Sequence, residues 1–253
     1  MYKVYYIQHS CFLVELEDRY LLFDYFDKDV LAQTISYSGC LPELLQDKTL
    51  YVFASHSHKD HWDVKNLALA AYHPLTKFIL SKDIRLGANY LKRNGFDLSI
   101  KEKIKFVKPL MKFEMDGMKI ETLHSTDAGV AFLITIGERL FFHAGDLNWW
   151  NVEGRGELYG EQYGREFKRF LKHIGNRLIN CAFVVLDPRM GEDGYFLGLD
   201  YFIKTFECEN IFPMHMWGDY KWIHRFKNRP DIANLKDKII EITQENMLFE
   251  IEE

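Results

Sequence analysis

The residues with the clearest chemical meaning are three histidines and one aspartate within six positions of the chain, namely His56, His58, Asp60 and His61. Imidazole and carboxylate groups are ligands that suit zinc, manganese and iron. In an extended backbone, the side chains of residues i and i+2 point the same way, so His56 and His58 can bind one ion together. Asp60 and His61 follow where the chain turns and can reach a second ion. The pattern should arise by chance in roughly one sequence per thousand of this length, so it indicates a metal site.

Three more potential ligands follow predicted strands, where loops commonly present functional side chains. His124 ends one predicted strand, Asp146 follows a second and His215 follows a third. Each stands beside small or turn-forming residues, as expected of a ligand at the rim of a fold. The competing interpretation of the first cluster is a polar loop that is rich in histidine by accident.

The order and spacing of these residues resemble the metallo-β-lactamase fold superfamily. The resemblance runs from about Tyr5 to about Met216 and includes an opening hairpin that ends at Asp24. It implies a four-layer αββα sandwich with the metals at the edge between the two sheets. The ligands that it implies are His56, His58 and His124 for the first metal, Asp60, His61 and His215 for the second, and Asp146 between the two.

The activity that the resemblance implies is hydrolysis by a hydroxide held between two divalent ions, with Asp60 and Asp146 as the catalytic carboxylates. A metal-bound water loses a proton near neutral pH, and the ions stabilise the developing oxyanion. The ligands suit zinc or manganese ahead of iron. His58 separates the chain from the flavodiiron branch, which has Glu there. The expected substrate is an ester, lactone or phosphodiester of a small anionic molecule, as in the sugar-phosphate lactonase and phosphodiesterase branch.

Two other functions remain open at this point. The same ligands can hold a single iron for oxygen-dependent chemistry on a thiol or persulfide, as in the persulfide dioxygenase branch. The site can also serve as a metal-bound interaction module without catalysis. Metal content, and oxygen uptake with a thiol substrate, would separate these possibilities.

Residues outside the ligand set are candidates for contact with the substrate. His9, at the start of the first strand pair, faces either the substrate or a ligand, or else it is a hydrogen-bonded strand end. Asp187 either supports a ligand or forms a turn with the proline that follows, and Arg189 suits an anionic substrate. Asp24 either orients a ligand histidine or forms a turn.

Two tryptophans, Trp149 and Trp150, lie close to Asp146 in the sequence. These tryptophans either line a substrate pocket or pack in the core. The Gly-rich, aromatic segment Asn148–Tyr163 is a candidate lid, and the role of the wider 148–180 segment is not predicted. Basic residues between positions 221 and 229 either recognise phosphate or carboxylate groups or form a solvated surface.

The elements that must position these residues alternate between strands and helices. Apolar runs separated by turn signals predict strands before residue 55 and between residues 113 and 143. Helical patterns cover Val64–Tyr72, Ser81–Arg93, Glu161–Ile174 and Leu197–Cys208. Late strands are predicted at Ala182–Leu186, Asn210–Met214 and Ile239–Ile242. We expect a layered α/β fold, two sheets with helices outside, in a single domain over residues 1–253.

Length and composition are those of an ordinary globular protein, with 253 residues, 47% hydrophobic and 27% charged. A net charge of −5 without long runs of like charge disfavours a broad nucleic-acid footprint. The four cysteines form no Cys-x-x-Cys pair and are predicted to be reduced thiols. No apolar run approaches the ~20 residues that span a bilayer, and no secretion signal is evident. We expect a cytoplasmic protein with a small-molecule substrate and no membrane contact; the sequence predicts no oligomeric state.

Overall fold

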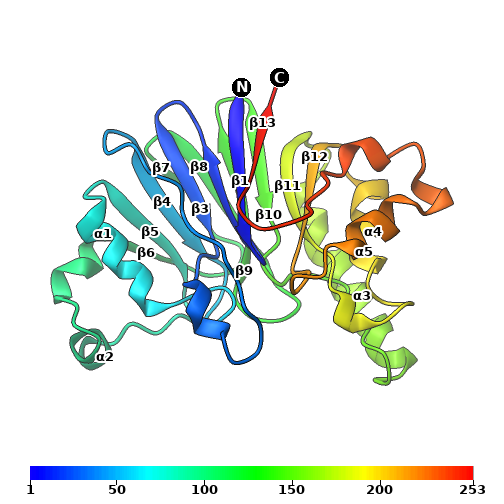
Figure 1. Cartoon of the computed structure of the whole chain (residues 1–253), viewed down its shortest axis with the longest axis horizontal. Coiled ribbons are helices and arrows are strands. Elements are labelled where there is room, and N and C mark those ends of the chain that lie inside the picture. Colours follow the sequence, from blue (N-terminus) through cyan, green and yellow to red (C-terminus); the bar gives the residue numbers. More distant parts are fainter. Residues whose placement is uncertain (253) are drawn as a thin grey trace. The chain divides into compact units, whose positions relative to one another are not determined.

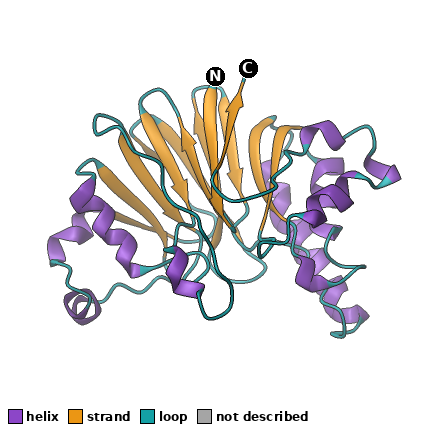
Figure 2. Ribbon diagram, viewed as in Figure 1, coloured by secondary structure: helices purple, strands orange, loops and turns teal. Residues whose placement is uncertain are grey.

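The structure, a computed structural model, describes residues 1–252 and divides into two compact units. Unit 1 comprises Met1–Val107 and the C-terminal residues from Gln244, and unit 2 comprises Lys108–Thr243. Each unit has one large mixed sheet with helices of its own (Figures 1 and 2). The predicted α/β class with two sheets is therefore confirmed, whereas the single domain over the whole chain stays a prediction.

The sheet of unit 1 has seven strands in the order β13-β1-β2-β3-β4-β5-β6. From β13 to β3 the neighbours are antiparallel, and from β3 to β6 they are parallel. The parallel strands β3 and β4 end side by side, so the residues that follow them meet at one edge of the sheet. The strands are β1 (Tyr2–Gln8), β2 (Cys11–Glu15), β3 (Arg19–Phe23), β4 (Thr49–Ala54), β5 (Thr76–Ser81), β6 (Ile104–Val107) and β13 (Met247–Ile251).

Short helices cover one face of this sheet, and an apolar core lies beneath them. The core includes Val52 and Phe78 from the strands, Leu67 from a 3-10 helix and Leu91 from α2, all of them almost fully buried. Burying such a side chain contributes about 1.5–3 kcal/mol, so these contacts hold the helices on the strands. The helices of unit 1 are α1 (Leu69–Tyr72), α2 (Ala88–Arg93) and the 3-10 helices Lys28–Leu31, Val64–Ala68 and Leu98–Lys103.

The sheet of unit 2 has six strands in the order β12-β11-β10-β9-β8-β7. It repeats the arrangement of unit 1, because β7 to β10 are antiparallel and β10 to β12 are parallel. The parallel strands again end at a common edge, where functional side chains are expected. The strands are β7 (Lys112–Met115), β8 (Met118–His124), β9 (Val130–Ile136), β10 (Arg139–His143), β11 (Ile179–Val185) and β12 (Cys208–Met214).

Longer helices accompany the second sheet. In the second half of helix α3 the apolar residues Phe167, Phe170 and Leu171 are all buried, as the 3.6-residue period predicts. Phe202 of α4 stacks on Phe142 of β10, with ring centroids 5.4 Å apart. The helices of unit 2 are α3 (Glu157–Leu171), α4 (Leu197–Thr205), α5 (Lys221–Lys227) and the 3-10 helices Lys172–Ile174, Pro188–Met190, Pro230–Ile232 and Lys236–Lys238.

Several predicted elements differ from the structure at their ends, and the helix predicted over Leu197–Cys208 stops at Thr205 because Cys208 begins β12. The helix expected over Ser81–Arg93 begins only at Ala88, because Ser81 still belongs to β5 and pairs with Val107. The strand expected at Ile239–Ile242 is reduced to one isolated bridge between Ile239 and Ile211, because a 3-10 helix precedes it directly. The last strand is instead β13, which the sequence pattern did not single out.

No helix within residues 1–252 combines the length and the apolar character that crossing a bilayer demands.

Two glycines of α3 let the segment after β10 lie close to the helix. A Cβ atom on Gly164 would lie 2.4 Å from the ring of Trp149, and one on Gly160 would lie 1.9 Å from Asn151 Oδ1. The Trp149 indole also donates to the Gly160 carbonyl, at 2.8 Å. Glycine inside a helix costs up to about 1 kcal/mol relative to alanine, so close packing is the reason for it here.

Gly164→Ala is expected to destabilise the protein by about 1–3 kcal/mol, because the new methyl group overlaps the Trp149 ring. Thermal or urea unfolding measures the loss. The cost should shrink in a Trp149→Phe background, where the smaller ring leaves room. An equal cost in both backgrounds would show that this contact does not anchor the segment.

Candidate metal centre

Asp24 organises the first group of histidines in unit 1. It follows β3, is 1% exposed and has a left-handed backbone with a φ of 44°. Its two carboxylate oxygens accept hydrogen bonds from Ser55 N, Ser55 Oγ and His61 Nδ1, each at 2.7 Å. The carboxylate therefore fixes both the start of the loop after β4 and the ring of His61. Of the two interpretations of Asp24, the orienting one matches its contacts.

The same contacts define which nitrogen of His56 carries a proton. Ser55 Oγ donates its only hydrogen to Asp24, so at 2.9 Å from His56 Nδ1 it can act only as an acceptor. His56 Nδ1 therefore carries hydrogen, and Nε2 keeps its lone pair. That Nε2 lies 3.0 Å from His58 Nδ1. Two imidazoles at this distance present donor atoms to a common point.

A second group of donors in unit 1 consists of His9, Asp60 and His61. One ligand atom from each lies within 4.8 Å of the others. His9 Nε2 is 3.4 Å and His61 Nε2 is 3.8 Å from Asp60 Oδ2. Both histidines are fully buried, whereas the Asp60 side chain is 16% exposed. His9 thus lies among the proposed ligands rather than at an ordinary strand end.

In unit 2 a second buried carboxylate orients the ring of His215. Asp187, after β11, accepts from His215 Nδ1 at 2.9 Å. Burial alone would raise the pKa of Asp187, but the hydrogen bonds and charges of His215 and Arg189 outweigh it and hold that pKa well below its usual range. The Arg189 guanidinium contacts both carboxylate oxygens of Asp187 and lies over the Trp217 ring, 4.2 Å from its centroid. Asp187 is therefore the main partner of the Arg189 side chain.

Asp146 lies in the loop after β10, beside His215. Its Oδ1 is 3.4 Å from His215 Nε2, and the residue is 5% exposed. Thr126 Oγ1 and Trp150 Nε1 both donate to the backbone carbonyl of Asp146, at 3.3 Å and 3.2 Å. These contacts hold the loop, so the Asp146 carboxylate has a fixed position next to His215.

The two tryptophans have different surroundings. The Trp150 ring meets His215 edge to face, with centroids 6.0 Å apart, so it borders the candidate ligands. Trp149 packs on α3, with Lys168 Nζ 4.1 Å from its ring centroid. The segment from Asn148 is thus tied to α3 at its start, and whether it acts as a lid stays a prediction.

His124 ends β8, and its ring stacks on Phe170 of α3 with centroids 4.9 Å apart. Three residues later, Asp127 brings a carboxylate oxygen to within 4.8 Å of a donor atom of Asp146. The sequence pattern did not predict Asp127 as a ligand. Its spacing from a histidine at a strand end was the available signal. Asp127 therefore adds a second carboxylate, beside that of Asp146, to the potential metal ligands of unit 2.

The donor chemistry of both units fits divalent metal ions. Each unit has a histidine held at Nδ1 by a buried carboxylate, His61 by Asp24 and His215 by Asp187. That arrangement presents Nε2 in the form that binds metals and is typical of metal-binding histidines. Within each unit the donor pairs lie 3.0–3.8 Å apart. Donors about 2.0–2.2 Å from one ion at a tetrahedral angle are about 3.3–3.6 Å apart, and the His9–Asp60 and His215–Asp146 separations of 3.4 Å fall within that range.

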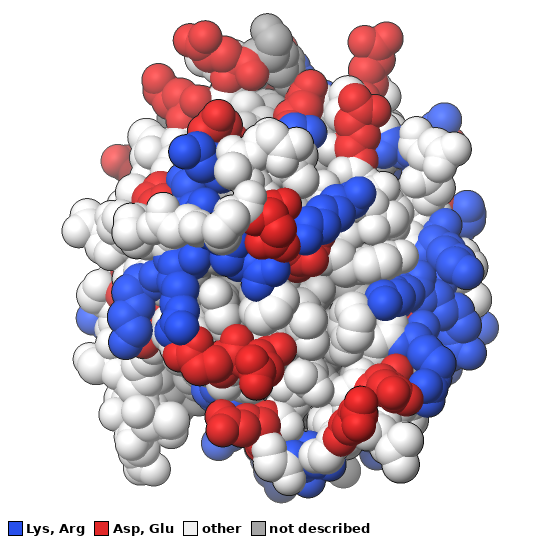
Figure 3. Space-filling model, turned by 90° about the vertical axis from the view of Figure 1, so that its right-hand side faces the viewer, with Lys and Arg blue, Asp and Glu red and all other residues white. Residues whose placement is uncertain are grey.

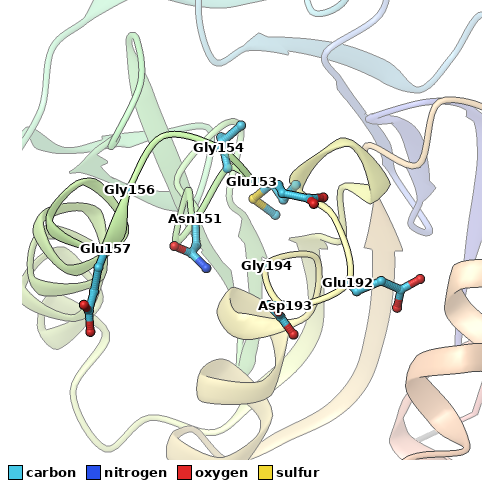
Figure 4. A pocket seen from close by; sticks show the side chains of 10 residues that line it. Asn151, Glu153, Gly154, Gly156, Glu157, Glu192, Asp193 and Gly194 are labelled. Carbon is cyan, nitrogen blue, oxygen red and sulfur yellow. The ribbon is translucent and has the colours of Figure 1, made fainter.

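A pocket of about 260 Å³ lies elsewhere in unit 2, between the 151–157 segment and the 192–194 loop. In Figure 4 the Asn151 side chain lies between α3 and that loop, whereas Glu157 and Glu192 point away from its centre. The acidic groups therefore do not converge on a common point.

Basic residues on the helices of unit 2 have acidic neighbours. Figure 3 shows lysine and arginine interleaved with aspartate and glutamate over this face. The pairs that involve the 221–229 segment are Lys221–Asp219, Arg225–Glu192, Lys227–Glu241 and Arg229–Asp231. The charges of this segment are balanced locally, so it is a surface rather than a prepared anion site.

Comparison with known proteins gives the following matches. The family model of the beta-lactamase superfamily domain matches residues 3–150. The fold is similar to that of Igni18, a metallo hydrolase from the archaeon Ignicoccus hospitalis, with a TM-score of 0.58 and 19% identity over 99% of both chains. It is also similar to an isothiocyanate hydrolase from Delia radicum gut bacteria, with a TM-score of 0.56 and 15% identity over 98% of this chain and 99% of that one.

A third similar structure is CmlA, a diiron beta-hydroxylase from Streptomyces venezuelae. Its TM-score is 0.53 and its identity 16%, over 85% of this chain and 45% of that one. At these identities the likeness shows the fold alone. No curated protein matches the sequence.

Proposed function

Because the chain belongs to the beta-lactamase superfamily, we propose that it is a metal-dependent hydrolase acting on an ester, lactone or phosphodiester of a small anionic molecule. The observation that carries the proposal is the pair of buried carboxylates, Asp24 and Asp187, that each hold one histidine at Nδ1. The proposed ligands of two divalent ions are His56, His58, Asp60, His61, His124, Asp146 and His215.

In this proposal the chain's own residues prepare the ligands before any ion binds. Asp24 holds His61 directly and holds His56 through Ser55, so one carboxylate sets the direction of two imidazoles. Asp60 and Asp146 supply negative charge that offsets the charge of the cations. When bound, the ions lower the pKa of water and stabilise negative charge on the substrate.

The residues beside His215 shape the environment of the reaction. The Trp150 and Trp217 rings both meet the His215 ring edge to face, at centroid distances of 6.0 Å and 5.6 Å. Aromatic walls of this kind exclude water from one side of a site and strengthen its electrostatic interactions. In this proposal they form part of the substrate pocket.

Removal and return of metal test the proposal. Chelator-treated protein is expected to lose hydrolysis of at least one substrate class among aryl esters, γ-lactones and aryl phosphodiesters. Zinc or manganese should restore it, with about two equivalents per chain by elemental analysis. His58→Ala should lower metal content without unfolding the protein, because His58 is exposed. His224→Ala, at another exposed histidine, is the matched control.

The proposal would be overturned if the metal-loaded protein turned over none of the three substrate classes. Iron belongs in the reconstitution series because a structure of the same fold is a diiron enzyme. One equivalent of iron together with oxygen uptake on a thiol would replace hydrolysis with oxygen chemistry. Metal binding with neither activity would favour a non-catalytic module.

A further inference from the structure

His9 has a backbone conformation that is uncommon for residues other than glycine. It is the first residue of the two-residue turn that joins β1 to β2, where Gln8 pairs with Cys11. Its φ is 49°, in the left-handed region. Turns of this kind favour Gly, Asn or Asp, because other residues pay a steric cost there. The contacts of the His9 side chain must therefore offset the backbone cost of this turn.

That side chain points inward, not to solvent. The His9 ring is fully buried, with edge contacts to Phe26 and to His61 at centroid distances of 6.2 Å and 5.8 Å. The Tyr37 hydroxyl lies 3.0 Å from His9 Nδ1. Nε2, on the opposite side of the ring, lies 3.4 Å from Asp60 Oδ2. The ring is thus held at one nitrogen by an outer partner and directed at a proposed ligand by the other.

We propose that His9 is itself a metal ligand, binding through Nε2 the ion that is also held by Asp60 and His61. This inference rests on the proposed function, since it assigns an eighth ligand to the same metal centre. The resemblance to the family implied no ligand at His9, so the assignment is carried by contacts in this structure.

The separation between His9 Nε2 and Asp60 Oδ2 supports shared coordination over a simple hydrogen bond. Hydrogen bonds between ring N–H and carboxylate oxygen are about 2.7–3.2 Å long. The His9–Asp60 separation of 3.4 Å exceeds that range and equals the separation expected for two donors on one zinc ion, about 3.3–3.6 Å. Nδ1–H then donates to the Tyr37 hydroxyl oxygen, which leaves Nε2 with its lone pair. His61 has the same arrangement, with Asp24 as its outer partner.

Ligation by His9 makes the two ions unequal. The ion at Asp60 receives three donors from unit 1, two of them buried imidazoles with fixed orientation, whereas His56 and His58 give the other ion two. More ligands with fewer free rotamers bind an ion more tightly. The ion at Asp60 should therefore be the last to leave when a chelator is titrated into the loaded protein.

His9→Asn is the primary test, because asparagine tolerates the left-handed turn but lacks the imidazole. Zinc affinity for one of the two equivalents should fall by more than about 100-fold, beyond the 10–100-fold that loss of an outer partner causes. Competition with a chelating indicator measures it. His9→Gly, which relaxes the backbone and has no side-chain donor, should behave likewise. Tyr37→Phe should weaken the same equivalent by only about 10-fold.

Two further readouts separate ligation from packing. The visible absorption of Co²⁺-loaded protein should change in His9→Asn but not in Tyr37→Phe, because only the former changes the donor atoms. Wild-type zinc affinity and an unchanged cobalt spectrum in both His9 variants, with wild type holding two ions and hydrolysing substrate, would overturn this inference and spare the proposed function. Wild-type protein that binds no metal would overturn both.

Discussion

Asp146→Ala is expected to reduce hydrolysis at least about 10³-fold and to lower the metal content below two equivalents per chain. Asp146 is buried, and its Oδ1 lies 3.4 Å from His215 Nε2. Two divalent cations about 4 Å apart would repel each other by about 16 kcal/mol at an effective dielectric constant of about 20, so the negative charge of Asp146 would be needed to offset the repulsion. Elemental analysis and initial rates on the best substrate measure both effects.

The fold should survive this substitution, because the contacts that hold the Asp146 loop use its backbone carbonyl. Circular dichroism and thermal unfolding of the metal-free variant check that point. Asp237→Ala, at an exposed position of a 3-10 helix, is the matched control and should change nothing. Full activity in Asp146→Ala would contradict the assignment of Asp146 to the metal centre.

Asp24→Asn is expected to weaken zinc binding at both ions by about 10–100-fold, although Asp24 touches neither. Asparagine tolerates the left-handed backbone, so the turn is preserved. Ser55 Oγ and His61 Nδ1 both donate to Asp24 Oδ2, and Ser55 N donates to Oδ1, so the amide NH₂ of asparagine would face either the first two hydrogens or the Ser55 N–H. His61 loses its orientation directly, and His56 loses it through Ser55. Chelator competition with zinc should show both equivalents affected.

Asp24→Ala should be more severe, because it leaves three buried donors without their acceptor. Each such donor costs about 1–3 kcal/mol, so the metal-free protein should lose about 3 kcal/mol or more of its unfolding free energy. Asp47→Asn, on an exposed turn, serves as the control. An Asp24→Asn variant that binds zinc as wild type does would show that the carboxylate has only a structural role.

Strands were predictable where the sequence gives both alternation and a turn. Asp116-Gly117 marks the hairpin between β7 and β8, and Gly117 has the positive φ that such turns demand. The prediction of element boundaries failed where one element follows another without a turn signal between them. Ser81 reads as a helix cap, but the ladder from β5 to β6 runs through it. The pairing of β13 with β1 joins the two ends of the chain, and no local signal can predict a contact of that length.

Much of the candidate site could be read from the sequence, because four donor residues fall in one short motif. What could not be read is how each ring is held. Nothing near Asp24 in the sequence indicates that it contacts His61, since that contact depends on β3 and β4 being parallel neighbours. Tyr37 and His9 meet for a similar reason, across 28 positions of chain. The residues that hold the ligands in place are brought to them by the strand topology, which the sequence does not show. The ligands themselves can be recognised from their spacing in the sequence.

The pairing of β13 with β1 also bears on how the protein is made. Tyr2 pairs with Ile251, so β1 is synthesised long before the strand that covers its edge. All of unit 2, Lys108–Thr243, is translated in between. Throughout that interval one edge of β1 has open backbone hydrogen-bonding groups, which other chains can pair with. The exposed edge of β1 is thus a place where pairing between chains could begin until β13 has been made.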